Sequence, residues 1–334
     1  MNPKRPKTLQ VHFQSNPKAP SVFHITEARY QTAARRHRHI ARFVRPSIAI
    51  DREGFFKRAR KADVLVGWHF PRENLETVAP NLKWIHIIGA GIEHLLPLDW
   101  LPKGVRLVNN SGVHEPKVRE YVSMALMMLH TRIPAFVTQQ KNAQWQEHFS
   151  TLIAGKTIAI LGVGQMGGAA AKEAKRLGLR VLGVRRHPRA NRYVDEMFTS
   201  SELHKVLPRA DFVLVTVPLT SETRGWIGRE AFDLMKEGAG FINLGRARVV
   251  DYDVLRAKLK KGKLSGAILD VFDPEPLPKD SPLWSTPNLI MTPHVASDDD
   301  EHYMPRTLDL FFDNVQRYLV GMPLRNRVLP ARGY

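Results

Sequence analysis

Short apolar runs alternate with helix-like stretches along most of the chain. The runs form two series, one in the first third of the chain and one after residue 155. Those of the second series are almost continuously apolar, as in strands that are buried on both faces of a parallel sheet. The pattern predicts an α/β fold with two doubly wound parallel-sheet domains. The first series comprises TLQVHF, ADVLVGW, LKWIHIIG and RLVNNSG, and the second KTIAILGVG, RVLGVR, ADFVLVTVP, GAGFINLG, SGAILDVF and NLIMTPH.

Two helices are predicted outside the paired strand-and-helix units. Residues 119–137 are mostly apolar and predict one long helix, interrupted late by Pro134 because proline lacks a backbone donor. Residues 29–45 mix basic side chains with Ala, Ile, Phe and Val, which is typical of an amphipathic helix with a solvated face.

The composition fits two globular domains, with 334 residues, 43% of them apolar and 25% charged. No stretch approaches the roughly 18 uninterrupted apolar residues that a membrane span needs, and the start MNPKRPKTLQ lacks the apolar core of a secretory signal. We therefore expect a cytoplasmic protein with no membrane partner. Because the chain has no cysteine, disulfides, thiolate zinc sites and thiol nucleophiles are excluded.

The formal charge of +18 raises the question of a nucleic-acid partner. Much of the excess lies in residues 29–45, and no recognition fold or aromatic-interleaved basic patch accompanies it. We therefore expect no nucleic-acid partner. An anionic small molecule would benefit from the same positive field.

The strand KTIAIL runs into the glycine loop G-V-G-Q-M-G, which contains Gly162, Gly164 and Gly167, and then into a helical stretch. Strand, glycines, helix and the next strand fit within about 30 residues, as in a dinucleotide site. Gly162 would allow the turn, Gly164 would let the backbone approach a pyrophosphate, and Gly167 would let helix and strand pack closely. A turn that serves packing alone is the alternative, but the strand and helix on either side favour a cofactor.

The strand after the glycine loop ends at Val184 and is followed by Arg185 and Arg186. An acidic residue here accepts hydrogen bonds from a free ribose 2′-hydroxyl, whereas guanidinium groups bind a 2′-phosphate. The pair therefore favours NADP(H) over NAD(H), with His187 and Arg189 as further candidates. The alternative is a solvated basic loop.

Several long motifs in this order resemble the D-isomer-specific 2-hydroxyacid dehydrogenases, and within them the glyoxylate/hydroxypyruvate reductase branch. They are AILGVGQMG, PLTSETRGWIG, FINLGRARVVD, GAILDVFDPEPLP, PLWSTPNLIMTPH and GMPLRNRV. The resemblance covers nearly the whole chain. It implies a dinucleotide-binding Rossmann domain at residues 114–297, inserted into a flavodoxin-like substrate-binding domain made of residues 1–113 and 298–334. It also implies a homodimer paired through the helix around Tyr121, with the region of Trp145 reaching the partner's site.

The family's catalytic residues match Arg246, Glu275 and His294. The resemblance implies that Arg246 grips the substrate's carboxylate and keto oxygen, a task that suits a planar fork of donors. It implies that Glu275 hydrogen-bonds His294 and keeps a proton available on the ring, which His294 gives to the carbonyl oxygen as general acid. A solvated arginine, a turn glutamate and a structural histidine are the separate alternatives. All three follow successive strands, however, whose ends gather where such sheets bind ligands.

The first domain is expected to supply the rest of the substrate pocket. Gly89, Ala90 and Gly91 follow a strand and can turn backbone N–H groups toward a carboxylate as an anion nest, or form a plain turn. Trp68 either lines the pocket or belongs to the core. Asp270 matches a family residue near the nicotinamide amide, or caps the next loop. The other residues expected to bind the cofactor are Gln165, Met166, Val217, Pro218, Leu244 and Gly245.

These observations together predict an NADP(H)-dependent reductase of a small 2-keto acid such as glyoxylate or hydroxypyruvate, with no metal required. Two alternatives stay open: an NAD-linked dehydrogenase of another 2-hydroxy acid, and a nucleotide-sensing, corepressor-like binding protein. Two departures from the family pattern bear on substrate choice. Ala247 and Arg248 stand where relatives commonly carry Gly and a neutral residue, and residues 298–301 form an acidic run.

Overall fold

The computed structural model describes residues 8–329, and the chain divides into two compact units. One unit joins Met1–Val113 to Asp299–Tyr334, and the other is His114–Asp298. Each unit contains one sheet whose strands all pair in parallel, so the predicted fold class is confirmed. Within residues 8–329, no helix combines the length and apolar character that crossing a bilayer requires.

The first unit has a five-stranded sheet with the order β2-β1-β3-β4-β5, which is the flavodoxin-like order. Side chains alternate between its two faces. Apolar side chains of α1, α2 and α11 pack on one face, and those of α3 and α4 on the other. The strands are β1 (Leu9–Gln14), β2 (Val44–Ala49), β3 (Val64–Gly67), β4 (Trp84–Ile87) and β5 (Arg106–Val108), and the helices are α1 (Glu27–Arg36), α2 (Arg38–Ala41), α3 (Arg52–Ala59), α4 (Leu75–Val78) and α11 (Tyr303–Leu319).

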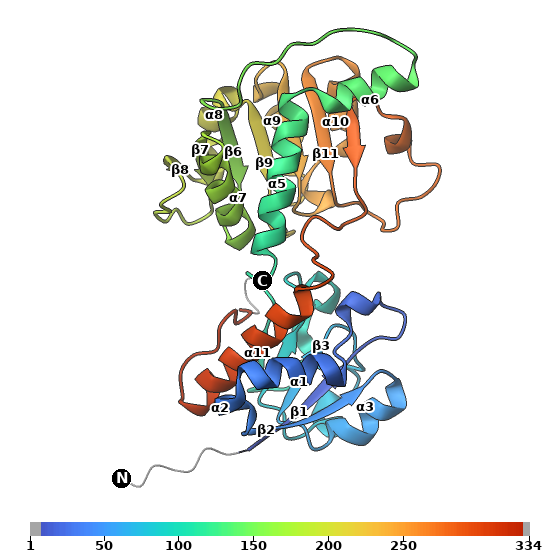
Figure 1. Ribbon diagram of the computed structural model, residues 1–334, viewed down its shortest axis with the longest axis vertical. Helices are drawn as coiled ribbons and strands as arrows, with labels where there is room; N and C mark the ends of the chain where they lie inside the picture. Colours follow the sequence, from blue (N-terminus) through green and yellow to red (C-terminus); the bar gives the residue numbers. More distant parts are fainter. Residues whose placement is uncertain (1–7, 330–334) are drawn as a thin grey trace. The chain divides into compact units, whose positions relative to one another are not determined.

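The second unit has a seven-stranded sheet with the order β12-β11-β10-β9-β6-β7-β8, a Rossmann sheet with one added strand. Helices α5 and α7 pack on one face, and α8, α9 and α10 on the other (Figure 1). Strand order reverses between β6 and β9, where such sheets bind their ligands. The strands are β6 (Thr157–Leu161), β7 (Arg180–Val184), β8 (Glu196–Phe198), β9 (Phe212–Val215), β10 (Ala239–Asn243), β11 (Leu264–Leu269) and β12 (Leu289–Met291), and the helices are α5 (Glu115–His130), α6 (Ile133–Lys141), α7 (Gln165–Arg176), α8 (Leu203–Val206), α9 (Arg229–Leu234) and α10 (Tyr252–Lys260).

Two predicted helices have the wrong bounds. The helix expected at 29–45 begins earlier, at Glu27, and it gives way to α2 and then to β2, which starts at Val44. This edge strand was missed because its basic residues continued the helix-like pattern. It tolerates its proline because one side of it is unpaired. The helix expected at 119–137 is two helices. The break lies at Arg132, in a left-handed conformation, and Pro134 falls in the first turn of α6, where no backbone donor is needed.

Candidate active site

The glycine loop packs closely against the loop after β9, at the point where the strand order reverses. Gly162 has φ +110°, and a Cβ there would lie 2.8 Å from the backbone nitrogen of Val217, in the loop after β9. A Cβ on Gly167 would lie 2.1 Å from the carbonyl oxygen of Gly162. Thr216 fixes the same carbonyl by donating a 2.7 Å hydrogen bond from Oγ1. Side chains are therefore excluded at two of the three glycines because the protein's own backbone fills the space.

Gly164 is different, because a Cβ there would meet nothing within 4 Å. It is the N-cap of α7, which has no side-chain cap and no acidic residue in its first turn. By contrast, α1 and α10 begin with capping side chains, from Thr26 and Asp251, and each carries an acidic residue in its first turn. The first amides of α7, those of Gln165 and Met166 among them, thus lack an intrahelical partner. An open glycine beside an uncapped helix terminus fits a pyrophosphate.

The two arginines after β7 have different surroundings. The backbone N–H of Arg185 donates to the Phe198 carbonyl at 3.0 Å, and the guanidinium of this half-buried residue has no partner within residues 8–329. Arg186 forms a 2.8 Å ion pair with Glu222, and both side chains are largely exposed. Such surface pairs contribute about 0–1 kcal/mol and exchange easily with a competing anion. Arg185 is therefore the more available of the two for a phosphate.

His294 and Glu275 contact each other across the loops after β12 and β11. His294 Nδ1 lies 2.8 Å from Glu275 Oε2, and the second carboxylate oxygen, Oε1, accepts a 2.8 Å hydrogen bond from the Phe272 N–H. A carboxylate only accepts, so Nδ1 carries the proton that donates to it. Both side chains are partly exposed. The imidazole is thereby oriented with Nε2 left for a ligand.

A buried aspartate holds the loop that carries His294. Asp270 accepts hydrogen bonds from Thr292 Oγ1 at 2.6 Å and from the N–H groups of Val295 and Ala296 at 2.9 Å. His294 itself has φ +55°, a left-handed conformation that is uncommon outside glycine. Burial raises the pKa of Asp270, and these hydrogen bonds oppose that rise. Asp270 was considered either as a residue near the nicotinamide amide or as a cap of the next loop. Its hydrogen bonds in this structure are those of a loop cap.

Arg246 is positioned by Asn243, which is fully buried at the end of β10. Asn243 accepts from the Gly245 N–H at 3.0 Å and donates to the Arg246 carbonyl at 3.3 Å. The half-buried guanidinium of Arg246 donates to the Gly245 carbonyl at 2.8 Å. Burial lowers the pKa of His114; the hydrogen bond with the Ser297 backbone opposes this, and the charges of Arg246 and His294 add to it. The hydrogen bonds of Asn243 and Gly245 thus fix the loop and the side chain of Arg246.

In the loop after β4, Gly89 is required by a contact that the sequence did not indicate. A Cβ on Gly89 would lie 1.9 Å from Cζ3 of the half-buried Trp68 ring. Neither Gly89 nor Gly91 has positive φ, so the loop lacks the left-handed residue that a backbone anion nest contains. Asn109 Nδ2 holds the Ala90 carbonyl at 2.7 Å. The Trp68 ring thus packs directly against Gly89.

Other sequence candidates have partners or positions of their own. Arg248 forms an ion pair with Asp273. Tyr121 is buried in the second unit, with its hydroxyl 2.6 Å from Thr292 Oγ1, so its side chain does not face outward from α5. Trp145 is 93% exposed. Val217 and Pro218 lie just beyond the end of β9, beside the glycine loop, and Leu244 is buried next to Gly245.

Residues 123–296 match the family model described as "D-isomer specific 2-hydroxyacid dehydrogenase, NAD binding domain". The chain belongs to the D-isomer-specific 2-hydroxyacid dehydrogenase family. It is therefore an NAD(P)-binding oxidoreductase, as the resemblance implied.

Named relatives of this dehydrogenase include an enzyme of Homo sapiens called glyoxylate reductase/hydroxypyruvate reductase. It is 31% identical over 80% of the chain and 81% of the relative. A D-3-phosphoglycerate dehydrogenase of Methanocaldococcus jannaschii is 33% identical over 77% of the chain, which spans only 50% of that longer protein. A solved family structure from Xanthobacter autotrophicus Py2, in complex with NADPH and MES, is 31% identical, with TM-score 0.83 over 98% of the chain and 100% of that structure.

The residues that position the dehydrogenase's site were missed as a class. Thr216, Asn243 and Thr292 each bind backbone or side-chain groups of a loop that carries a candidate residue. Each interrupts an apolar run close to the end of a strand, in LVTVP, FINLG or LIMTPH. A polar residue at such a position must find a hydrogen bond if it is buried. That signal was present in the sequence.

Proposed function

We propose that this dehydrogenase reduces a small 2-keto acid, glyoxylate or hydroxypyruvate, with NADP(H), and that His294 is its general acid. The proposal rests chiefly on the 2.8 Å contact between His294 Nδ1 and Glu275 Oε2. A carboxylate that fixes one ring nitrogen orients the other toward substrate and stabilises the charged imidazole.

The protein's own groups would divide the work. When bound, the nicotinamide supplies or accepts the hydride. Arg246 binds the substrate carboxylate and keto oxygen through its planar donors, and His294 holds a proton at Nε2 for the oxygen that becomes a hydroxyl. Glu275 orients the imidazole, and the Asp270 hydrogen bonds hold its loop in place. In the oxidative direction His294 accepts the proton instead.

The cofactor would lie on the glycine loop and the uncapped start of α7, with Arg185 selecting NADP(H). A guanidinium without a partner in residues 8–329 stands where a ribose-binding carboxylate is otherwise expected. The related Xanthobacter autotrophicus structure is a complex with NADPH, which agrees with this choice. The human relative's name agrees with the choice of substrate.

We also propose a homodimer. Met124 and Met127 of α5 are 42% and 41% exposed, and the nearby segment exposes Trp145, Phe149 and Leu152 by 83% or more. Exposed apolar groups of this size are typical of a covered surface. Light scattering of wild type and of the Trp145→Ser/Phe149→Ser variant tests it. A wild-type monomer at micromolar concentrations contradicts the proposal.

Initial rates with glyoxylate, hydroxypyruvate, pyruvate and 3-phosphohydroxypyruvate, each with NADPH and with NADH, test activity, cofactor and substrate together. We expect NADPH to give the higher kcat/KM. Arg185→Gln should raise the KM for NADPH by about 10-fold or more and leave that for NADH nearly unchanged, since a charged hydrogen bond contributes about 1.5–3 kcal/mol. Arg229→Gln, an exposed arginine on α9, is the matched control.

Equal use of both cofactors would contradict the role of Arg185 and favour the NAD-linked alternative. Turnover confined to another keto acid would correct the substrate. No turnover with any of them, together with tight NADPH binding, would favour the nucleotide-sensing protein.

A further inference from the structure

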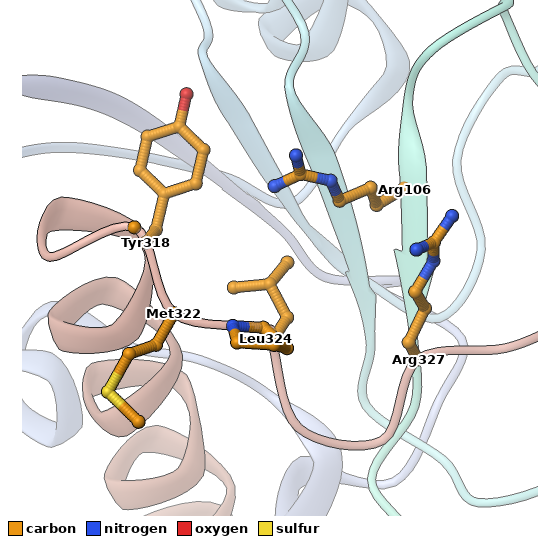
Figure 2. Close-up of a pocket in the computed structure, with 7 residues that line it drawn as sticks. Arg106, Tyr318, Met322, Leu324 and Arg327 are labelled. Atoms are coloured by element: carbon orange, nitrogen blue, oxygen red, sulfur yellow. The ribbon is translucent and has the colours of Figure 1, made fainter.

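The first unit contains a cavity of about 370 Å³ between the edge strand β5 and the carboxyl end of α11 (Figure 2). Cavities that hold small molecules are typically about 300–1,000 Å³. Its lining combines two guanidinium groups and a phenol with apolar side chains. The lining residues are Arg106, Tyr318, Gly321, Met322, Pro323, Leu324 and Arg327.

The two arginines share one face of the sheet because of strand register. Val108 forms an antiparallel bridge with Arg327, so the side chains of this pair lie on the same face. Arg106 lies two residues from Val108 on β5 and therefore points to that face too. Val108 packs in the core beneath α11, which identifies the face. In Figure 2 the side chain of Arg106 extends from its strand toward Tyr318 and Leu324.

Hydrogen bonds hold the wall of the cavity in place. The fully buried Asn314 of α11 accepts from the Arg325 N–H at 2.7 Å. Asn326 donates to the carbonyl oxygens of Asn109 and Ser111 at 3.2 and 2.6 Å. The Val328 N–H donates to the Leu107 carbonyl at 2.9 Å. The segment that carries Arg327 is thus fixed to both α11 and β5, so the cavity does not depend on a free loop.

The charge in this region is not balanced. Asp313 accepts ion pairs from Arg317 at 3.2 Å and from Arg325 at 2.5 Å. Arg106 and Arg327 have no side-chain partner in the part of the chain that the structure describes. The carbonyls at 316, 317 and 318 in the last turn of α11 each accept a backbone N–H group. Two cations therefore face a partly apolar cavity without a counter-charge.

We propose that this cavity binds a small organic oxyanion, a carboxylate or phosphate monoester attached to a compact apolar group. The guanidinium groups of Arg106 and Arg327 would bind the oxyanion, for which their planar donors are suited. The Tyr318 hydroxyl would donate to it, and Met322 and Leu324 would contact the apolar part. The site lies within the first unit, whereas the glycine loop and the His294–Glu275 pair belong to the second, and it does not depend on the proposed function.

Isothermal titration of the full chain with phenyl phosphate and with benzoate, at constant ionic strength, tests the proposal. Wild type is expected to bind at least one probe, and the tighter of the two identifies the preferred head group. Arg106→Gln/Arg327→Gln should weaken that binding by about 10-fold or more, since it removes two charge-assisted contacts. The control Arg35→Gln/Arg38→Gln removes the same charge from exposed arginines of α1 and α2 and should change the affinity less than about twofold.

Two results would overturn the proposal. One is the absence of binding by wild type with either probe. The other is equal binding by the Arg106→Gln/Arg327→Gln variant with a loss in Arg185→Gln, which would place the probe on the nucleotide loop instead. Both cavity arginines are exposed, so the double variant is expected to fold, and circular dichroism checks this.

Discussion

The carboxyl ends of the two parallel sheets carry different kinds of residue. In the seven-stranded sheet, the loops after three neighbouring strands present Arg246, Glu275 and His294. The buried side chains of Asn243 and Asp270 hold the first and the last of these loops. In the five-stranded sheet, the loop after β4 presents Gly89, packed under Trp68. Parallel sheets thus present charged side chains at the strand ends of one unit and a close-packed glycine and tryptophan at those of the other. Topology gathers loops at one edge, but the residues decide the chemistry.

The largest expected effect comes from removing His294, the proposed proton donor at the seven-stranded sheet. His294→Asn should lower kcat by about 10²–10⁴-fold, because general acid catalysis contributes that much. Asparagine accepts the left-handed conformation at 294, so the loop should stay folded. Stopped-flow single turnovers measure the step, and NADPH titration of the same variant is the control. An unchanged kcat would remove His294 from the mechanism.

Glu275→Gln separates orientation from proton donation. Glutamine keeps the shape, but it cannot accept from both the Phe272 N–H and His294 Nδ1 with a full charge. We expect kcat to fall by about 10- to 100-fold, since a charged hydrogen bond contributes about 1.5–3 kcal/mol. In the His294→Asn background the same change should have little effect. Independent, additive losses would contradict a shared role.

Gly89→Ala tests the close packing of Gly89 and Trp68 at the five-stranded sheet. Its Cβ would overlap the Trp68 ring, so we expect a loss of about 1–3 kcal/mol in the free energy of unfolding together with a higher KM for the keto acid. Urea unfolding followed by circular dichroism measures the first, and initial rates the second. In a Trp68→Ala background the alanine should be tolerated. A full loss of stability in that background would show that the ring is not the cause.

The smallest expected effect is a pH dependence at Asp298. Burial raises the pKa of this carboxyl to about 6, above its usual 3.8. The unfolded chain ionises first, so stability falls as pH rises from about 4 to 6, and the penalty is complete at neutral pH. Asp298→Asn should increase the free energy of unfolding at pH 7 by about 1–2 kcal/mol and have little effect at pH 4. Equal effects at both pH values would contradict the raised pKa.

Much of the architecture could be predicted because it depends on local pattern. Continuous apolar runs are strands buried on both faces, and ten of the twelve strands in the described residues were identified this way. The two missed strands, β2 and β8, are partly exposed edges, so they lack the apolar continuity that marks the others. The helix break at Arg132 was also missed, because the left-handed residue there is an arginine and not the glycine that usually marks such a position.

By itself the sequence determined two parallel sheets, a glycine loop between strand and helix, and three polar residues after successive strands. These follow from apolar periodicity and from conformations that only glycine adopts readily, both of which are local properties. Only the tertiary structure decided that Glu222 pairs with Arg186, that Asp270 binds the His294 loop, and that Trp68 requires Gly89. Those partners lie some 20 to 36 residues apart, so their contact depends on how strands and loops pack together.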